Sequence, residues 1–116
     1  MKFYRSKNGS VVVKPFDVPC DCEVIEPNIT DAAGEKHVPV ISVNGNVVTV
    51  TVGEVEHPML EAHYIAFIAL ETDKGYSVRN LAAGDKPCTS FAIEEGEKVI
   101  AAYEYCNLHG LWKAEA

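Results

Sequence analysis

Residues 38–52 read VPVISVNGNVVTVTV, and this stretch decides the fold class. Val38 to Val43 is a β-branched run with Pro39 near its start, a position that an edge strand tolerates. Asn44-Gly45 is a dipeptide that type I′ hairpin turns prefer. From Asn46 to Val52 the valines and threonines alternate, which is typical of a strand. The stretch predicts two antiparallel strands joined by a tight turn.

Further along the chain, four more segments of strand-like composition are separated by turn signals: Tyr64 to Leu70, Tyr76 to Leu81, Thr89 to Ile93 and Val99 to Tyr105. Together with the two strands above and one short N-terminal strand, they make about seven strands. This spacing predicts an all-β fold, an antiparallel β-sandwich. One alternative is a helix across Met59 to Leu70, which Pro58 would permit in its first turn. The aromatic and β-branched residues of Tyr64 to Leu70 favour a strand.

The composition is that of one globular domain with a short N-terminal arm. The chain has 116 residues, 47% of them apolar. Three prolines interrupt residues 1–34, so we expect an irregular segment with one or two short strands at most. We divide the chain into an arm, residues 1–30, and a sandwich domain, residues 31–116.

Charge and hydropathy exclude several classes of function. The net charge of −7 argues against nucleic-acid binding, which needs a basic face. The chain contains no run of about 18 apolar residues, so no transmembrane helix is predicted. The basic start of the chain is not followed by an apolar segment, so we expect no secretory signal and a cytoplasmic location.

The four histidines all lie at the ends of predicted strands. His37 opens one strand, His57 and His63 bracket the loop before another, and His109 follows the last. Loops gather at the two ends of a sandwich, so these side chains can converge. His57 and His63 can share a metal ion only if the chain curls between them.

Four cysteines complete the candidate set: Cys20, Cys22, Cys88 and Cys106. Without an export signal, metal ligation or buried thiols are better interpretations than disulfides. Cys106 and His109 have the spacing Cys-x-x-His, so both side chains can reach one metal ion from a tight loop.

Three segments together resemble the signature segments of the superoxide reductases, the desulfoferrodoxin and neelaredoxin family. The segments are Glu35-Lys36-His37-Val38-Pro39, His57-Pro58-Met59 with His63-Tyr64-Ile65, and Cys106-Asn107-Leu108-His109-Gly110-Leu111-Trp112-Lys113. The resemblance covers about residues 28–116. It implies an immunoglobulin-like β-sandwich and an enzyme that reduces superoxide to hydrogen peroxide at a mononuclear non-haem iron.

The resemblance also implies roles for individual residues. The iron ligands would be His37, His57, His63, His109 and Cys106. Glu35 would take the sixth position in the oxidised state, or is a surface carboxylate without an essential role. Lys36 would lie beside the open position, attract superoxide and orient water for protonation, or is an ordinary solvated lysine.

Family resemblance further implies partners and leaves an alternative function open. A small redox protein such as rubredoxin would supply electrons, and the chain would form a dimer or tetramer. Five ligands are too many for a closed tetrahedral zinc site, although zinc or copper could still occupy the centre. The alternative is an electron-transfer or structural module whose metal site is closed.

The N-terminal arm departs from relatives that carry a desulforedoxin-like domain with a second iron. Cys20-x-Cys22 resembles part of that layout, but Ser6, Lys7, Asn8 and Gly9 stand where the first cysteine pair would be. Two thiols cannot complete a tetrahedral site in one chain, so we predict no metal here. Pairing of Cys20 and Cys22 with a neighbouring subunit stays open. Cys88 matches no ligand position, and we expect an idle thiol.

Overall fold

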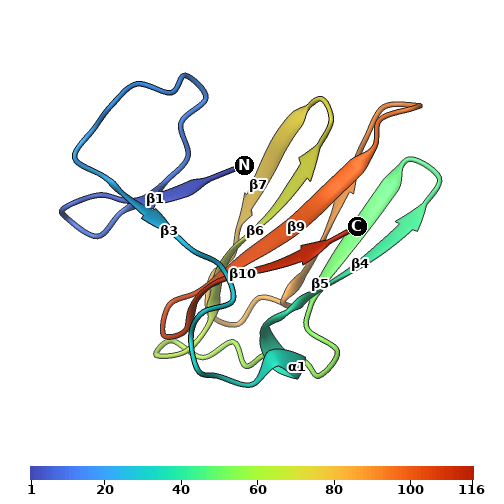
Figure 1. Ribbon diagram of the computed structural model, residues 1–116. Helices are drawn as coiled ribbons and strands as arrows, with labels where there is room; N and C mark the ends of the chain where they lie inside the picture. Colours follow the sequence, from blue (N-terminus) through green and yellow to red (C-terminus); the bar gives the residue numbers. More distant parts are fainter.

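The computed structural model describes residues 1–116 and is almost entirely β-structure in three antiparallel sheets (Figure 1). A three-stranded N-terminal sheet precedes two sheets that form the sandwich. The elements in chain order are β1 (Phe3–Arg5), β2 (Val11–Val12), β3 (Glu23–Ile25), α1 (Gly34–His37), β4 (Pro39–Asn44), β5 (Val47–Val52), β6 (Ile65–Thr72), β7 (Gly75–Asn80), β8 (Cys88–Ala92), β9 (Val99–Cys106) and β10 (Gly110–Glu115).

The sandwich consists of a four-stranded sheet, β10-β9-β6-β7, and a three-stranded sheet, β4-β5-β8. The sandwich confirms the predicted fold class, but its seventh strand is β10 and not the N-terminal strand that the prediction counted. The alternation in β5 buries Val48, Val50 and Val52 completely in the core. The run at 64–70 forms the inner strand β6, whose Ile65 and Leu70 are buried in the same core, so the helical alternative is wrong.

The β4–β5 hairpin forms as predicted, but its turn is displaced by one residue. Asn44 pairs with Val47, so Gly45 and Asn46 are the two central residues. Gly45 has a φ of 61°, whereas Asn46 has a negative φ. Positive φ at the first central residue alone is the pattern of a type II′ turn, not of type I′.

The N-terminal segment is more ordered than the sequence predicted, because it forms three short strands in the order β2-β1-β3. This small sheet covers the outer face of the four-stranded sheet. Phe3 stacks on Phe67 at a ring distance of 5.5 Å and contacts Tyr103 at 5.0 Å. The Met1 ammonium lies 2.7 Å from Glu71 Oε2, and Tyr103 donates to Glu71 Oε1 at 2.9 Å. The apolar outer face explains why the segment is held down.

Two elements near the metal motifs were not predicted. The single helical turn α1 ends at His37, which therefore precedes β4 rather than opening a strand. The strand β10 pairs with β9 from Gly110, opposite Cys106, to Glu115. The four residues of α1 are far fewer than a helix needs to cross a membrane. In Figure 1, α1 and the β9–β10 turn lie at the same end of the sandwich.

Candidate metal centre

Strand register in the four-stranded sheet brings three of the predicted ligands together. β6 pairs with β9 so that Ile65 lies opposite Cys106. His63 comes two residues before Ile65, which places its imidazole beside the Cys106 thiol. The β9–β10 turn then returns the chain past His109, three residues after Cys106.

The three-stranded sheet supplies the other two. Pro39 of β4 pairs with Val52 of β5, and His37 lies two residues before Pro39. The backbone N–H of His57 donates to the carbonyl of Val52 at 3.1 Å. Both histidines are thus attached to the same end of one strand pair.

The chain curls between His57 and His63, as sharing a metal ion requires. Leu60 and His63 exchange both backbone hydrogen bonds, N–H to carbonyl, at 2.9 and 3.0 Å. The two imidazole rings lie 4.6 Å apart and nearly perpendicular to each other.

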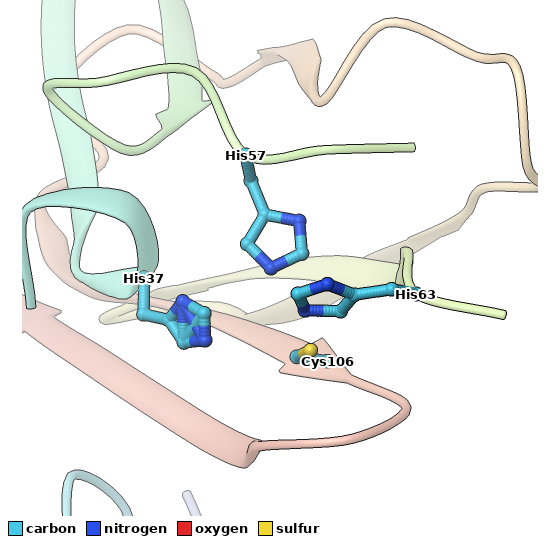
Figure 2. A group of neighbouring side chains, drawn as sticks. All are labelled: His37, His57, His63 and Cys106. Carbon is cyan, nitrogen blue, oxygen red and sulfur yellow. The ribbon is translucent and has the colours of Figure 1, made fainter. Parts of the chain in front are cut away.

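Four donor side chains converge on a common space (Figure 2). One ligand atom from each of His37, His57, His63 and Cys106 lies within 4.8 Å of all the others. Donors on opposite sides of one ion, with bonds of about 2.0–2.3 Å, lie about 4–4.6 Å apart. The cluster therefore has the size that one transition-metal ion needs.

His109 lies against this cluster through its Nδ1 atom. That atom is 3.0 Å from His37 Nε2 and 3.8 Å from Cys106 Sγ. All five side chains singled out in the sequence thus come together at one place, from three separate segments of the chain.

Hydrogen bonding at the cluster leaves imidazole nitrogens without partners. His57 donates from Nδ1 to the Pro58 carbonyl at 2.6 Å, so its Nε2 carries a free lone pair. His57 Nε2, His63 Nε2 and His37 Nδ1 are buried without any hydrogen-bond partner. Buried polar atoms without partners are rare and unfavourable. A cation that accepts the lone pairs of His57 and His63 satisfies those two nitrogens, so this donor set fits a metal ion.

The environment keeps three of the histidines, His37, His57 and His63, neutral. Burial, reinforced by the neighbouring imidazoles, lowers the pKa of His37 to about 4. Burial is also the main cause of the lowered pKa values of His57 and His63. The imidazoles are therefore ready to bind a cation at neutral pH without losing protons.

Cys106 differs, because burial raises the pKa of its thiol. Backbone N–H groups of His109 and Leu108 act in the opposite direction but do not cancel the effect of burial. A bound cation stabilises the thiolate and displaces the proton.

Asn107 was not predicted as a site residue, yet it fixes the position of His63. Its side-chain oxygen accepts from the Tyr64 N–H at 2.9 Å, and its amide donates to the Ala62 carbonyl at 3.1 Å. Its backbone N–H also donates to the Tyr64 carbonyl at 3.1 Å. Both neighbours of His63 are thereby tied to the β9–β10 turn. The only sequence signal was its place between Cys106 and His109.

Trp112 supports the cluster from β10. Its indole Nε1 donates to the His109 carbonyl at 3.2 Å. Its ring meets the His37 ring edge-on at a centroid distance of 4.9 Å. The tryptophan therefore restrains two of the five side chains at once.

The donor side chains differ in their exposure to solvent. His37, His57 and Cys106 are buried, whereas His63 and His109 are half-buried. Lys36 is exposed and lines a hollow of about 570 Å³ together with His57. Its charge contributes to the lowered pKa values of His57 and His63.

Glu35 lies apart from the convergent donors. It lines a separate hollow with Val38 and Glu54, and it is absent from the four-donor cluster. Its backbone carbonyl accepts from the Val55 N–H at 2.9 Å.

The remaining cysteines are also outside the centre. All four cysteines are free thiols. Cys20 and Cys22 belong to the N-terminal segment, and Cys88 forms a hydrogen bond with Thr51 at 3.4 Å.

Comparison with known families agrees with this geometry. The model of the family described as Desulfoferrodoxin matches residues 29–115, which contain the whole cluster. The chain belongs to the desulfoferrodoxin family.

Similar members of the family include a desulfoferrodoxin from Clostridium acetobutylicum, 41% identical over 123 residues, with 99% of this chain and 96% of the relative covered. A superoxide reductase from Pyrococcus furiosus is 33% identical over 111 residues, covering 73% of this chain and 90% of the relative. The crystal structure of the superoxide reductase from Treponema pallidum has a TM-score of 0.84 and 34% sequence identity, and the match covers 99% of this chain and 100% of that one. The match to that structure thus includes the N-terminal sheet.

Proposed function

We propose that the chain is a superoxide reductase that converts superoxide to hydrogen peroxide with one electron and two protons. The main support for this proposal is the convergence of four donor atoms within 4.8 Å of one another, with His109 Nδ1 beside them. Relatives named superoxide reductase support the proposal. Superoxide reductases use mononuclear iron, and a cluster of imidazoles with one thiol suits iron.

The proposed ligands are His37, His57, His63, His109 and Cys106. Bound ferrous iron would supply the single electron, and thiolate ligation favours its release. The neutral histidines contribute lone pairs without charge, so Cys106 is the one anionic donor of the set. Its burial keeps water away from the sulfur.

Lys36 is proposed to attract the anionic substrate and hold water for proton delivery. The body of the protein carries a net charge of −7, which repels superoxide at long range. Lys36 is exposed and lines the hollow that reaches His57. The positive charge of Lys36 at this hollow attracts superoxide locally and so offsets the long-range repulsion.

Glu35 is proposed as a ligand only of the oxidised centre. The carboxylate belongs to the same helical turn as His37 but lines another hollow. Binding would therefore require the side chain to swing around α1, which an exposed glutamate can do.

Several features of the cellular context are also proposals. Leu60 and Leu108 are exposed large apolar residues on the two turns that carry His63 and His109. They suit a small redox protein such as rubredoxin as electron donor. We further propose a cytoplasmic homo-oligomer, and residues 1–30 as the remnant of a desulforedoxin-like domain without a metal site.

The test is a superoxide pulse applied to the iron-loaded, reduced protein. We expect one hydrogen peroxide for each superoxide consumed, no release of dioxygen, and oxidation of one iron per event. Dioxygen release would indicate dismutation instead, and an unchanged ferrous centre would contradict the proposal. Azide distinguishes the alternative of a closed electron-transfer or structural site, because a closed site shows no spectral change on adding it.

Lys36→Ala tests the steering role. We expect the second-order rate constant for superoxide to fall about tenfold at low ionic strength, with a weaker dependence on salt. Lys98→Ala is the matched control, because Lys98 is also exposed but lies in the β8–β9 connection at the other end of the sandwich (Figure 1). Equal effects of the two substitutions would refute the role.

A further inference from the structure

The N-terminal segment carries two thiols that the metal centre does not use. Cys20 is exposed and Cys22 is half-buried, and both are free. They lie on the long loop that leads into β3 (Figure 1). The chain bends at Asp21, between them, so the two cysteines are brought closer than in a straight strand.

A lysine is held beside this pair by contacts of its own. The Lys14 ammonium donates to the Val18 carbonyl at 2.8 Å and lies 3.1 Å from Asp17 Oδ1. It also stands 4.4 Å above the centre of the Tyr4 ring. Its side chain is only 16% exposed, so the charge has a fixed place under the loop. The Cys20 thiol is near enough to this ammonium and to the Cys22 thiol for both to lower its pKa.

These contacts make the two thiols unequal. The hydrogen bond from Cys22, with a contribution from Lys14, lowers the pKa of Cys20. The same hydrogen bond raises the pKa of Cys22, which donates it. Cys20 is therefore the more acidic and more readily ionised of the two thiols, and Cys22 is its hydrogen-bond donor.

We propose that Cys20 and Cys22 form a dithiol that hydrogen peroxide oxidises to an intramolecular disulfide, with Cys20 attacking and Cys22 resolving. The source of peroxide in this proposal rests on the proposed function, whose product is hydrogen peroxide. The reactivity of the pair does not depend on it.

The reaction balances in two steps. The Cys20 thiolate attacks one peroxide oxygen, the O–O bond breaks, and Cys20 sulfenic acid and hydroxide form. Hydroxide takes a proton from solvent. The Cys22 sulfur then attacks the Cys20 sulfur, the S–O bond breaks, and the departing hydroxide leaves as water with the Cys22 proton. The dithiol loses two electrons, and one peroxide becomes two waters.

Ring closure is feasible because residues 13–22 belong to no strand or helix. A disulfide needs Cα atoms about 4.4–6.8 Å apart, and a bend between residues i and i+2 gives such a separation. The other thiols are poorer partners. Cys106 is buried in the core, and Cys88 is half-buried and bonded to Thr51.

The experiment adds equimolar hydrogen peroxide to the full-length, iron-loaded protein, blocks free thiols, and maps peptides by mass spectrometry. We expect one Cys20–Cys22 disulfide per chain, a mass loss of two hydrogen atoms, and recovery of both thiols with dithiothreitol. Cys22→Ser should stop at a Cys20 sulfenic acid that dimedone traps. Lys14→Gln should slow the reaction, by about threefold for each unit by which the thiol pKa rises, because the loss of thiolate is partly offset by its greater nucleophilicity. Cys88→Ser, the control, should react like the parent.

Two results would overturn the proposal: both thiols still free after excess peroxide, or a disulfide that joins two chains on a non-reducing gel. Tight zinc binding by the pair with no oxidation would also overturn it. Because peroxide is added directly, failure here leaves superoxide reduction untouched. A protein that forms the disulfide but does not reduce superoxide refutes only the proposed function.

Discussion

Gly53→Ala should displace the turn that carries His37. A Cβ at residue 53 would lie 2.7 Å from the Glu35 carbonyl oxygen, 3.0 Å from the Lys36 carbonyl carbon and 3.1 Å from the Val38 oxygen. All three are backbone atoms, so no flexible side chain can move aside. Restoring a separation of 3.4 Å to the Glu35 oxygen requires a shift of about 0.7 Å.

The magnitude follows from two effects. Overpacking of this kind costs about 1–3 kcal/mol. The Glu35 carbonyl also accepts from the Val55 N–H at 2.9 Å, and losing that bond costs about 0.5–1.5 kcal/mol more. We expect the free energy of unfolding to fall by about 1.5–4.5 kcal/mol. Metal affinity should fall about 10–100-fold, because His37 moves with the turn.

Gly34→Ala provides the matched control for both measurements. Gly34 lies in α1, the helical turn that ends at His37. A Cβ at Gly34 would meet nothing within 4 Å, and the φ of Gly34 is outside the left-handed region. Urea unfolding and a competitive metal titration should show a neutral or slightly stabilising effect. The reasoning is refuted if Gly53→Ala stays within about 0.5 kcal/mol of the parent, or if Gly34→Ala is equally harmful.

Three further predictions concern the surroundings of the cluster. Asn107→Ala should lower metal affinity about tenfold, because it frees the His63 segment. Asn80→Ala is the control and should leave the affinity unchanged, because Asn80 is exposed and its side chain makes no hydrogen bonds. Equal affinities of the two variants in a chelator competition would contradict this role of Asn107. Glu104 is fully buried without a hydrogen-bond partner, and burial raises its pKa from 4.5 to about 9. The folded state thus holds a proton that the unfolded state loses above pH 4.5, so stability is full below that pH and falls toward pH 9. Glu104→Gln should flatten this fall of the unfolding free energy with pH by up to about 1.4 kcal/mol per pH unit. If urea titrations at several pH values give the same pH slope for variant and parent, Glu104 is not the group responsible. Metal binding at pH 7 should release about one proton from Cys106 and none from His37, His57 or His63. Calorimetry in buffers of different ionisation enthalpy measures the number of protons released, and three or more would refute the neutrality of these three imidazoles.

The fold was predictable wherever one strand has two distinct faces. In β5, alternate residues Val48, Val50 and Val52 must be buried while the threonines between them need not be, and that requirement is written in the local sequence. The inner strand β6 was predictable for another reason, because a short aromatic and β-branched run suits a strand buried on both faces.

Elements that depend on distant partners left no such signal. The strands of the N-terminal sheet have two or three residues, too few for a periodic pattern, and Phe3 pairs with Ile25 across the loop. β10 is defined by its register with β9 rather than by its own composition. The turn α1 has no side-chain N-cap, since Ala33 precedes it, and so it was not predicted either.

The candidate site was likewise predictable from the sequence only in part. Physical reasoning predicted that strand-end histidines converge, but resemblance to a family was needed to select the five side chains. Their actual convergence depends on register: Ile65 opposite Cys106 in one sheet and Pro39 opposite Val52 in the other. A shift of one residue in either pairing would turn a donor away from the cluster. Asn107, whose role is visible only in its contacts, could not be predicted.

The cluster also joins the two sheets of the sandwich. Val52, Ile65 and Cys106 belong to one buried apolar core directly beneath the donors, and they come from both sheets. This packing removes water from the Cys106 sulfur and leaves imidazole nitrogens unpaired. His63 and His109 are the half-buried members of the donor set. One hydrophobic contact between the sheets therefore both assembles the donors and makes a cation favourable among them.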